Sequence, residues 1–323
     1  MSTATLRQRF RRWATRTRTP ETQPIQLPQR RVYVLPTRAG LALLATLLAM
    51  LLASINYNLS LGYGLVFLLG SVFIVHILHS WRTLTGLQLS LSPSGEAFAG
   101  GMAQWRVELV NEASHERPAV RLRDSQGREL MLTDVPAGQH SEAFIALPCP
   151  QRGVLQPGQL SVESTQPLGW IRAWSYIEPD APAVIYPAPD GERPLPEGWG
   201  DNGEGRSRER PGQDDFAGLR GFQPGDSPRQ IAWKQLAQGR GLLTKQFASA
   251  GSPACVLDWN MLPATLPLEE RISQLARWVL QTRHSGARTT LLLPDSQTGP
   301  GEDAAHHQAC LLRLALFGLE RSR

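Results

Sequence analysis

Residues 39–55 read AGLALLATLLAMLLASI, and residues 61–78 read LGYGLVFLLGSVFIVHIL. Neither run contains a charged residue, and only the short polar turn Asn56–Ser60 separates them. A helix rises 1.5 Å per residue, so about 20 apolar residues cross the hydrocarbon core of a bilayer. The two runs therefore predict a transmembrane hairpin over residues 39–80, with both of its ends on the same side of the membrane.

The positive charge of the chain is concentrated just before this hairpin. The 323 residues carry a net charge of +5, with 31 arginines and 2 lysines against 28 acidic residues. Residues 1–38 hold nine of these arginines and one acid, so they carry +8 and the rest of the chain carries −3. Arginine beside a span favours the cytoplasmic side. We therefore expect residues 1–38 to be a basic cytoplasmic tail, with the C-terminal domains also cytoplasmic.

A sequence pI near 9.5 also suggests nucleic-acid binding. The position of the arginines favours a different partner, the lipid bilayer, because a basic residue near an anionic membrane surface contributes about 1 kcal/mol. We expect no nucleic-acid partner. The three cysteines, Cys149, Cys255 and Cys310, are far apart and odd in number. This pattern excludes a disulfide scaffold and a zinc site of the CxxC type.

Residues 83–187 show short alternating segments separated by turn-forming residues. Examples are Gln104–Val110, Ala119–Arg123 and Glu142–Leu147, with turns at Ser92–Gly95 and Pro136–Gly138. Alternation with a period of two, interrupted at this spacing, is typical of an antiparallel β-sandwich of immunoglobulin-like size. Residues 188–213 are rich in Pro, Gly, Glu and Arg, and they predict a linker to the last part of the chain.

Residues 214–323 contain the most distinctive motif, LRGFQPGDSPRQIAWK at 219–234. Pro224-Gly225 predicts a turn, and Asp226 suits the N-cap of a short helix from about Pro228 to Ala237. Two interpretations remain open: a salt-bridged structural turn, or a partner-binding surface. The partner-binding interpretation uses the following residues: Arg220, Pro224, Gly225, Asp226, Arg229, Trp233 and Lys234.

The last 70 residues predict a strand–helix–strand unit followed by a second helix. The strands are expected at 254–258 and 289–293, and the helices at 269–284 and 303–319. Such a unit closes as a right-handed parallel crossover. Asp258 and Asp295 then lie at the carboxyl ends of parallel strands, where open α/β sheets bind ligands.

The whole order resembles the bacterial family catalogued as domain of unknown function 58. The resemblance starts at Arg38 and rests mainly on the motif at 224–234, together with Arg152-Gly153, Gln166–Trp170 and Tyr186-Pro187. It implies a protein of the bacterial cytoplasmic (inner) membrane that serves as a non-catalytic accessory factor or scaffold. The implied partners are a MoxR-type AAA+ ATPase and a transglutaminase-like membrane protein.

The resemblance also implies that the C-terminal part is similar to a von Willebrand factor A domain, truncated here. Complete domains of that kind bind a divalent metal through an Asp-x-Ser-x-Ser loop. This chain reads Asp258-Trp259-Asn260-Met261-Leu262, which keeps only the aspartate. Asp258 and Asn260 provide too few oxygen ligands for Mg²⁺, so we expect a degenerate metal site and no cofactor.

The fold class expected is thus α+β multidomain: a hairpin, a β-sandwich and a truncated α/β unit. Two alternatives to the scaffold function remain open. One is a metal-dependent protein-binding module that uses the partial site at Asp258. The other is a thiol enzyme, with Cys255 or Cys310 as nucleophile and His306 or His307 as base. We expect the cysteines to be core residues instead, and the protein not to be an enzyme.

Overall fold

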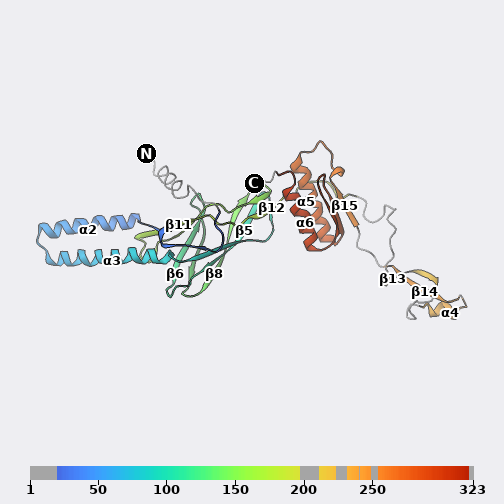
Figure 1. Cartoon of the computed structure of the whole chain (residues 1–323), viewed down its shortest axis with the longest axis horizontal. Helices are drawn as coiled ribbons and strands as arrows, with labels where there is room; N and C mark the ends of the chain where they lie inside the picture. Colours follow the sequence, from blue (N-terminus) through green and yellow to red (C-terminus); the bar gives the residue numbers. More distant parts are fainter. Residues whose placement is uncertain (1–19, 197–210, 223–230, 240, 249–253, 320–323) are drawn as a thin grey trace. The chain divides into compact units, whose positions relative to one another are not determined.

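The computed structural model describes residues 20–196, 211–222, 231–239, 241–248 and 254–319 (Figure 1). It is an α+β structure that divides into two compact units. Described residues up to Pro187, together with those from Ala315 onward, form the first unit, and those from Ala188 to Leu314 form the second.

Two long apolar helices open the first unit. They are α2 (Arg38–Asn56) and α3 (Ser60–Leu84), each long and apolar enough to cross a membrane, and most of their side chains are exposed. A soluble protein would bury such helices in its core. Thr37 caps α2 by accepting a hydrogen bond from the Gly40 N–H. The hairpin is longer than residues 39–80, because α3 continues to Leu84 and its last turns pack on the β-sandwich.

Two antiparallel sheets of the first unit face each other across a common core. The four-stranded sheet has the order β1-β3-β5-β8, and the five-stranded sheet has the order β2-β11-β10-β6-β7. A small sheet, β4-β12-β9, adds to the end of the sandwich. The strands are β1 (Ile25–Gln26), β2 (Tyr33–Pro36), β3 (Gln88–Ser94), β4 (Ala97–Phe98), β5 (Gly101–Val110), β6 (Arg117–Arg123), β7 (Glu129–Val135), β8 (His140–Cys149), β9 (Gly153–Leu155), β10 (Leu160–Ser164), β11 (Ile171–Ile177) and β12 (Ala183–Tyr186).

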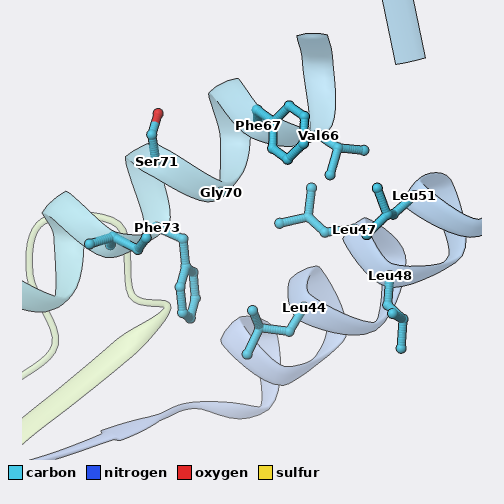
Figure 2. Close-up of a pocket in the computed structure, with 10 residues that line it drawn as sticks. Leu44, Leu47, Leu48, Leu51, Val66, Phe67, Gly70, Ser71 and Phe73 are labelled. Atoms are coloured by element: carbon cyan, nitrogen blue, oxygen red, sulfur yellow. The ribbon is translucent and has the colours of Figure 1, made fainter. Parts of the chain in front are cut away.

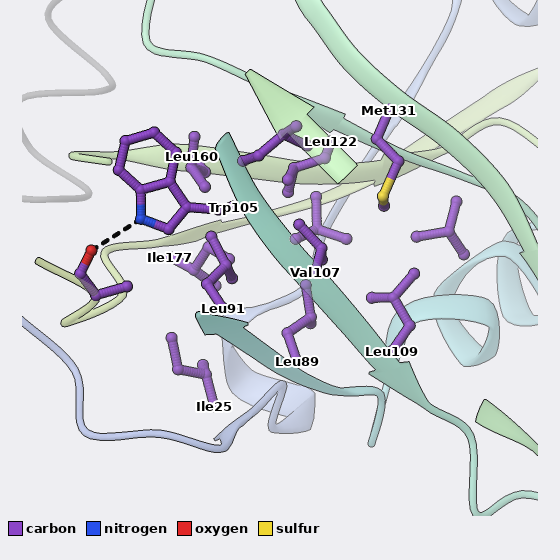
Figure 3. Packing of buried hydrophobic residues seen from close by; sticks show 14 of the residues in the cluster. Ile25, Leu89, Leu91, Trp105, Val107, Leu109, Leu122, Met131, Leu160 and Ile177 are labelled. Carbon is purple, nitrogen blue, oxygen red and sulfur yellow. Dashed lines mark hydrogen bonds between the residues drawn. The ribbon is translucent and has the colours of Figure 1, made fainter. Parts of the chain in front are cut away.

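The sandwich core is filled by alternate residues of these strands (Figure 3). Trp105 of β5 lies at its centre with no exposed surface, and its indole Nε1–H donates to the Ala181 carbonyl at 2.9 Å. Leu89, Val107 and Leu122 pack in the same cluster. The prediction of an antiparallel β-sandwich is therefore confirmed, but its strands are not limited to residues 83–187.

The prediction that residues 1–38 are only a tail is wrong for their second half. Strand β1 pairs with β3, and β2 pairs with β11, so this segment supplies an edge strand to each sheet. A short 3₁₀ helix, η1 (Gln29–Arg31), joins the two strands. Ile25 and Leu27 are buried in the core. Their burial outweighs the high charge of the segment, which had dominated the prediction.

The second unit contains a three-stranded sheet, β15-β16-β17, with two helices. Its elements are β15 (Ala254–Asp258), η3 (Trp259–Met261), α5 (Leu268–Ser285), β16 (Arg288–Leu292), β17 (Gln297–Gly301) and α6 (Ala304–Leu316). Strands β15 and β16 are parallel and joined by α5, as the sequence predicts. Strand β17 was not predicted, because QTGPG lacks apolar alternation; it pairs antiparallel with β16.

The predicted linker 188–213 is wrong at both ends. At its start, Gln274 of α5 accepts from the Arg193 N–H at 3.0 Å, and Trp278 Nε1–H donates to the Arg193 carbonyl at 3.2 Å. The Arg277 guanidinium also donates to the Gly191 carbonyl. At its end, Pro211 begins β13 (Pro211–Gly221). The start of this segment is thus hydrogen-bonded to α5, and its end belongs to strand β13, although the sequence there shows no apolar period.

Candidate functional site

The distinctive motif is carried by a two-stranded ribbon and a short helix. Strand β13 pairs antiparallel with β14 (Leu243–Ala248), and the register sets Arg220 opposite Thr244. The last part of the motif lies against this ribbon, because Ile231 forms a β-bridge with Thr244 and the Ala232 N–H donates to the Leu243 carbonyl at 2.8 Å. Helix α4 (Trp233–Ala237) follows immediately.

The predicted helix start at Pro228 is therefore wrong, since Ile231 is extended and the helix begins at Trp233. Pairing with β14 explains this difference. Ile231 and Ala232 are buried against β14, whereas Trp233 is 59% exposed and Lys234 is exposed. An indole that is largely exposed beside an ammonium group is a typical interface anchor.

Four of the predicted partner-binding residues lie outside the described residues: Pro224, Gly225, Asp226 and Arg229. Arg220, the second residue of the motif, lies in β13. The ribbon thus carries Arg220, Trp233 and Lys234 within one pair of strands and its helix. A two-stranded ribbon is marginally stable by itself, so it gains from contact with a partner.

The degenerate metal loop is organised by its own side chains. Asp258 Oδ1 accepts from the Asn260 N–H at 2.8 Å and caps the turn η3. The Arg271 guanidinium stacks 3.9 Å above the Trp259 ring and donates to the Trp259 carbonyl. The positive charge of the Arg271 side chain is therefore already held against this loop. Across the part of the chain that the structure describes, no group of three or more His, Cys, Asp or Glu side chains could hold a metal ion.

The structure brings His306 and Cys310 together on one face of α6, as their spacing predicts. Cys310 Sγ lies 3.5 Å from His306 Nε2, but this nitrogen is also 2.7 Å from the Thr289 carbonyl, to which it must donate its proton. It therefore has no lone pair with which to accept the thiol proton. Cys310 is completely buried, and burial raises its thiol pKa, as it does for Cys255. This geometry does not suit nucleophilic catalysis.

The segment Gln166–Trp170 has a role that the sequence did not reveal: it clamps the two apolar helices to the sandwich. The Thr37 hydroxyl donates to the Gly169 carbonyl at 2.7 Å, just before α2 begins. On α3, the Ser80 hydroxyl donates to the Gln166 carbonyl at 3.1 Å, and Phe73 stacks on Trp170 with ring centroids 6.3 Å apart. A side chain on Gly40 would collide with the Trp170 carbonyl. Both helices are thus fixed by one loop.

A buried arginine forms a second attachment. The Arg117 guanidinium donates through Nε to Asn111 Oδ1 at 2.6 Å and through Nη1 to the Thr83 carbonyl at 2.8 Å. Burial without a neighbouring carboxylate in these contacts lowers the pKa of Arg117. The Thr83 carbonyl belongs to the last turn of α3, where no further helical N–H is available to it. The contact therefore ties the end of α3 to β6.

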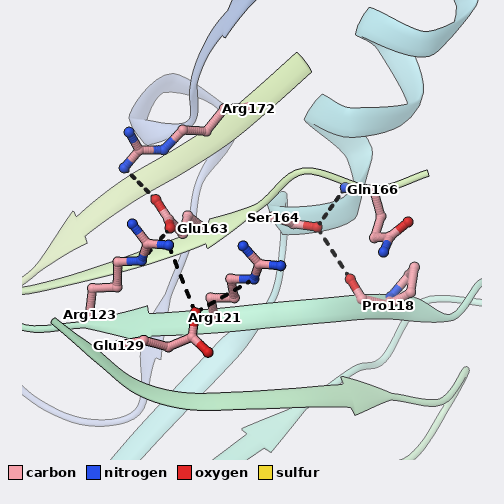
Figure 4. Close-up of polar contacts among 8 residues, drawn as sticks. All are labelled: Pro118, Arg121, Arg123, Glu129, Glu163, Ser164, Gln166 and Arg172. Atoms are coloured by element: carbon pink, nitrogen blue, oxygen red, sulfur yellow. Dashed lines mark hydrogen bonds and ion pairs between the residues drawn. The ribbon is translucent and has the colours of Figure 1, made fainter. Parts of the chain in front are cut away.

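The five-stranded sheet carries an ion-pair network on its other face (Figure 4). Glu163 is only 2% exposed and pairs with Arg123 Nε at 2.6 Å and with the Arg172 guanidinium. Arg123 also faces Glu129 at 3.8 Å. Charged side chains of three adjacent strands, β6, β10 and β11, are thereby paired on one face of the sheet.

Comparisons with known proteins give little further information. The chain matches no known protein-family model, and no curated protein matches it. Among solved structures, it is similar to the CARDB domain of PF1109 from Pyrococcus furiosus. That similarity has 10% sequence identity and a TM-score of 0.18, and it covers 28% of this chain and 94% of the archaeal domain.

Proposed function

We propose that this protein is a membrane-anchored, non-catalytic scaffold that docks a MoxR-type AAA+ ATPase through the β13–β14–α4 ribbon. The observation that carries the proposal is the exposed Trp233-Lys234 pair on a ribbon that buries the adjacent Ile231. The resemblance of the 224–234 motif to domain of unknown function 58 supports the choice of partner. The same resemblance makes a transglutaminase-like membrane protein a further component of the assembly.

We propose that the helices α2 and α3 anchor the protein in the bacterial inner membrane, and their length and apolar composition support this. Their exposed surface is apolar along most of its length, with Leu48, Leu52, Phe67 and Val75 among the exposed side chains. Arg38 begins α2 and Arg82 lies in the last turn of α3, at the end where the sandwich is attached. Positive charge at that end favours a cytoplasmic sandwich and a periplasmic turn near Asn58.

The C-terminal unit is proposed to be a truncated relative of the von Willebrand factor A domain. The parallel pair β15–β16 with its crossover helix α5 supports this assignment. In such a unit the loop after β15 would normally bind a metal. Here the Asp258 carboxylate is engaged by the Asn260 N–H, and Arg271 binds the same loop. Docking without a metal is the interpretation that these contacts favour.

The docking surface is tested by a double variant with a matched control. Trp233→Ala with Lys234→Glu should abolish co-purification of the ATPase with the full-length chain from detergent-solubilised membranes. The control is Leu312→Ala with Arg313→Glu on α6, an adjacent apolar–basic pair that is also exposed. It makes the same change of charge on the same unit, so it should leave ATPase recovery unchanged.

Two results would contradict the proposal. One is equal recovery of the ATPase with both double variants, which would place the contact elsewhere. The other is the absence of any AAA+ ATPase from the wild-type complex. Topology is tested separately with Asn58→Cys, because the three native cysteines are buried. A membrane-impermeant maleimide should label this position from the periplasmic side only.

A further inference from the structure

The Gln166–Trp170 clamp meets both apolar helices at one level of the hairpin. On α2 it lies at the first turn, where the Trp170 carbonyl would collide with a side chain on Gly40. On α3 it lies in the second half of the helix, because Trp170 stacks on Phe73 and packs edge to face against His76, with ring centroids 6.3 Å and 5.7 Å away. The part of the hairpin between these contacts and the turn does not touch the clamp, and we call it the free part.

Apolar side chains line the space between the two helices in the free part (Figure 2). Leu47 of α2 and Val66 of α3 are buried there, and Leu52 and Leu68 are exposed on the outside. Ser71 is the one polar residue that lines this space, and its hydroxyl already donates to a carbonyl of its own helix at 2.7 Å. The free part therefore suits the hydrocarbon core of a bilayer.

The free part is nevertheless shorter than that core. At 1.5 Å per residue, the segment of α2 from Gly40 to Asn56 is about 24 Å long. The segment of α3 from Ser60 to the contacts with Phe73 and His76 is about 20–24 Å long. The hydrocarbon core of a typical bilayer is about 30 Å thick, so about 6–10 Å of apolar length is lacking.

The apolar surface of α3 continues past the free part and indicates where the lacking length comes from. Ile74, Val75 and Leu78 are exposed, although they lie beside the clamp or between it and the end of α3. The first exposed residue of α3 that can carry a positive charge is His79, about 9 Å along the axis from Phe73. If hydrocarbon covers this surface as far as Leu78, the clamp lies level with the edge of the hydrocarbon core.

The exposed side of the clamp has the composition of a membrane interface. The segment Gln166–Trp170 contains no charged residue, and Leu168 is 50% exposed. Leu35, at the end of β2 that leads into α2, is exposed as well. Tryptophan is enriched where the hydrocarbon core meets the headgroups, which is the level that these contacts give to Trp170.

Basic residues flank this apolar surface on the side of the sandwich. Arg38 begins α2 and Arg82 lies in the last turn of α3, and both are exposed. Arg172 of β11 lies opposite Leu35 in the register, and it pairs with Glu163 while keeping part of its side chain exposed. Positive charge at this level is complementary to the phosphate groups of anionic lipids. The charge thus favours lipid headgroups as the partner of this surface.

We infer that the Gln166–Trp170 clamp is itself a membrane-contact element, which lies in the bilayer interface on the side of the sandwich with Leu168 inserted among the lipids. The inference rests on the proposed insertion of α2 and α3 into the bilayer. Insertion of the clamp supplies the apolar length that the free part lacks, and it places Arg38 and Arg82 at the level of the lipid phosphates. The clamp then holds both helices and also seats the sandwich directly on the membrane.

The test measures the depth of a fluorescent label at Leu168. Full-length Leu168→Cys is labelled with the fluorophore NBD, which is selective because the three native cysteines are buried. The substitution leaves the clamp in place, since its hydrogen bonds use the backbone carbonyls of Gln166 and Gly169. The protein is reconstituted into vesicles of phosphatidylethanolamine and phosphatidylglycerol that carry a nitroxide quencher either near the headgroup or near the end of the acyl chain. We expect the shallow nitroxide to quench this label more strongly than the deep one.

Two further positions calibrate the measurement. Val154→Cys is the matched control, because Val154 is 61% exposed on β9. Strand β9 pairs with β12, which lies at the end of the sandwich away from α2 and α3 (Figure 1). Neither nitroxide should quench a label there. Leu68→Cys is the reference inside the bilayer, since Leu68 is exposed on the free part of α3, and the deep nitroxide should quench it most strongly.

The outcomes separate this inference from the proposed anchorage. Quenching at Leu68 without quenching at Leu168 would overturn the inference and leave anchorage standing, because the bilayer would then thin around a short hairpin. A lack of quenching at Leu68 would place the hairpin outside the bilayer, so that both proposals fail. Equal quenching at Leu168 and Val154 would also overturn the inference, since contact with lipid would not be confined to the clamp.

Discussion

The two units of this protein bury their sheets to very different extents. In the first unit, two sheets enclose a common core, and strands such as β5 alternate between fully buried and exposed side chains. In the second unit, Leu257 and Leu291 are buried beneath helices, but Val256 on the opposite face of β15 is 46% exposed. Parallel strands are normally covered on both faces.

This difference indicates that the first unit is rigid, whereas the second unit has exposed surface that suits contact with a partner. The sandwich holds the apolar helices through hydrogen bonds and a stacked aromatic pair. These contacts keep their geometry only if the sandwich itself is rigid. The second unit instead exposes Val256 on its sheet and Trp233 on its ribbon. An exposed apolar group contributes little to the stability of the isolated chain, and it becomes useful when a partner covers it.

Trp105→Ala should produce the largest loss of stability. The substitution leaves a cavity in the sandwich core and removes the hydrogen bond to the Ala181 carbonyl, so we expect a cost of about 3–5 kcal/mol. Urea unfolding of the first unit, with hydrogen exchange of the β5 amides as the probe, measures this loss in the free energy of unfolding. Trp233→Ala is the control: the same change at an exposed position should cost less than about 0.5 kcal/mol. Equal costs at the two tryptophans would contradict the contrast between the units.

Glu163→Gln should destabilise the sandwich next most strongly. The variant removes the buried charge that faces two arginines, but these are 29% and 35% exposed and keep part of their hydration. We therefore expect about 2 kcal/mol, less than the cost of breaking a completely buried pair. Glu129→Gln is the matched control, because Glu129 is 44% exposed and lies 3.8 Å from its arginines. Its unfolding midpoint in urea should barely change.

These contacts also show how far the sequence could predict the molecule. The hairpin, the sandwich and the β15–α5–β16 crossover were predictable, because each has a strong hydrophobic period over many residues. The strand Ile25–Gln26 was not predictable, since the three residues between Pro24 and Pro28 are too few to show a period and only pairing with β3 defines the strand. Glu163 was missed for a similar reason: its neutralising arginines come from different strands, at positions 123 and 172.

The candidate site was predicted less well than the fold. The exposure of Trp233 depends on the bridge between Ile231 and Thr244, a pairing across 13 residues that local helix signals obscured. In the sequence, Gln166–Trp170 is distinctive only through the family resemblance, and nothing in it indicates a clamp. Its contacts with Thr37 and Ser80 span about 130 and 86 positions, and no local pattern specifies partners at that distance.

Asp124 should give the sandwich a measurable acid sensitivity. Burial alone would raise the pKa of this carboxyl, but hydrogen bonds from Arg128 and from the Gln126 N–H outweigh it and lower the pKa. The stabilisation is therefore present above the unfolded-state pKa of about 4 and is lost as the pH falls through the lower folded-state value. In urea titrations between pH 6 and pH 3, Asp124→Asn should reduce the slope of stability against pH. If the profiles of stability against pH for Asp124→Asn and the wild type run parallel, Asp124 does not contribute to the acid sensitivity.

The smallest expected effect is a difference between the two units in the reactivity of their native thiols during unfolding. Cys149 is buried in the sandwich, whereas in the second unit Cys255 is buried on strand β15 and Cys310 is buried on helix α6. All three thiols are buried, and burial raises the thiol pKa of Cys255 and Cys310, so none of the three should react rapidly with a maleimide in the native state at pH 7. As urea is increased, Cys255 and Cys310 should react at lower concentrations than Cys149. Simultaneous labelling would mean that the units unfold together, and rapid native labelling of Cys310 would restore the thiol-enzyme alternative.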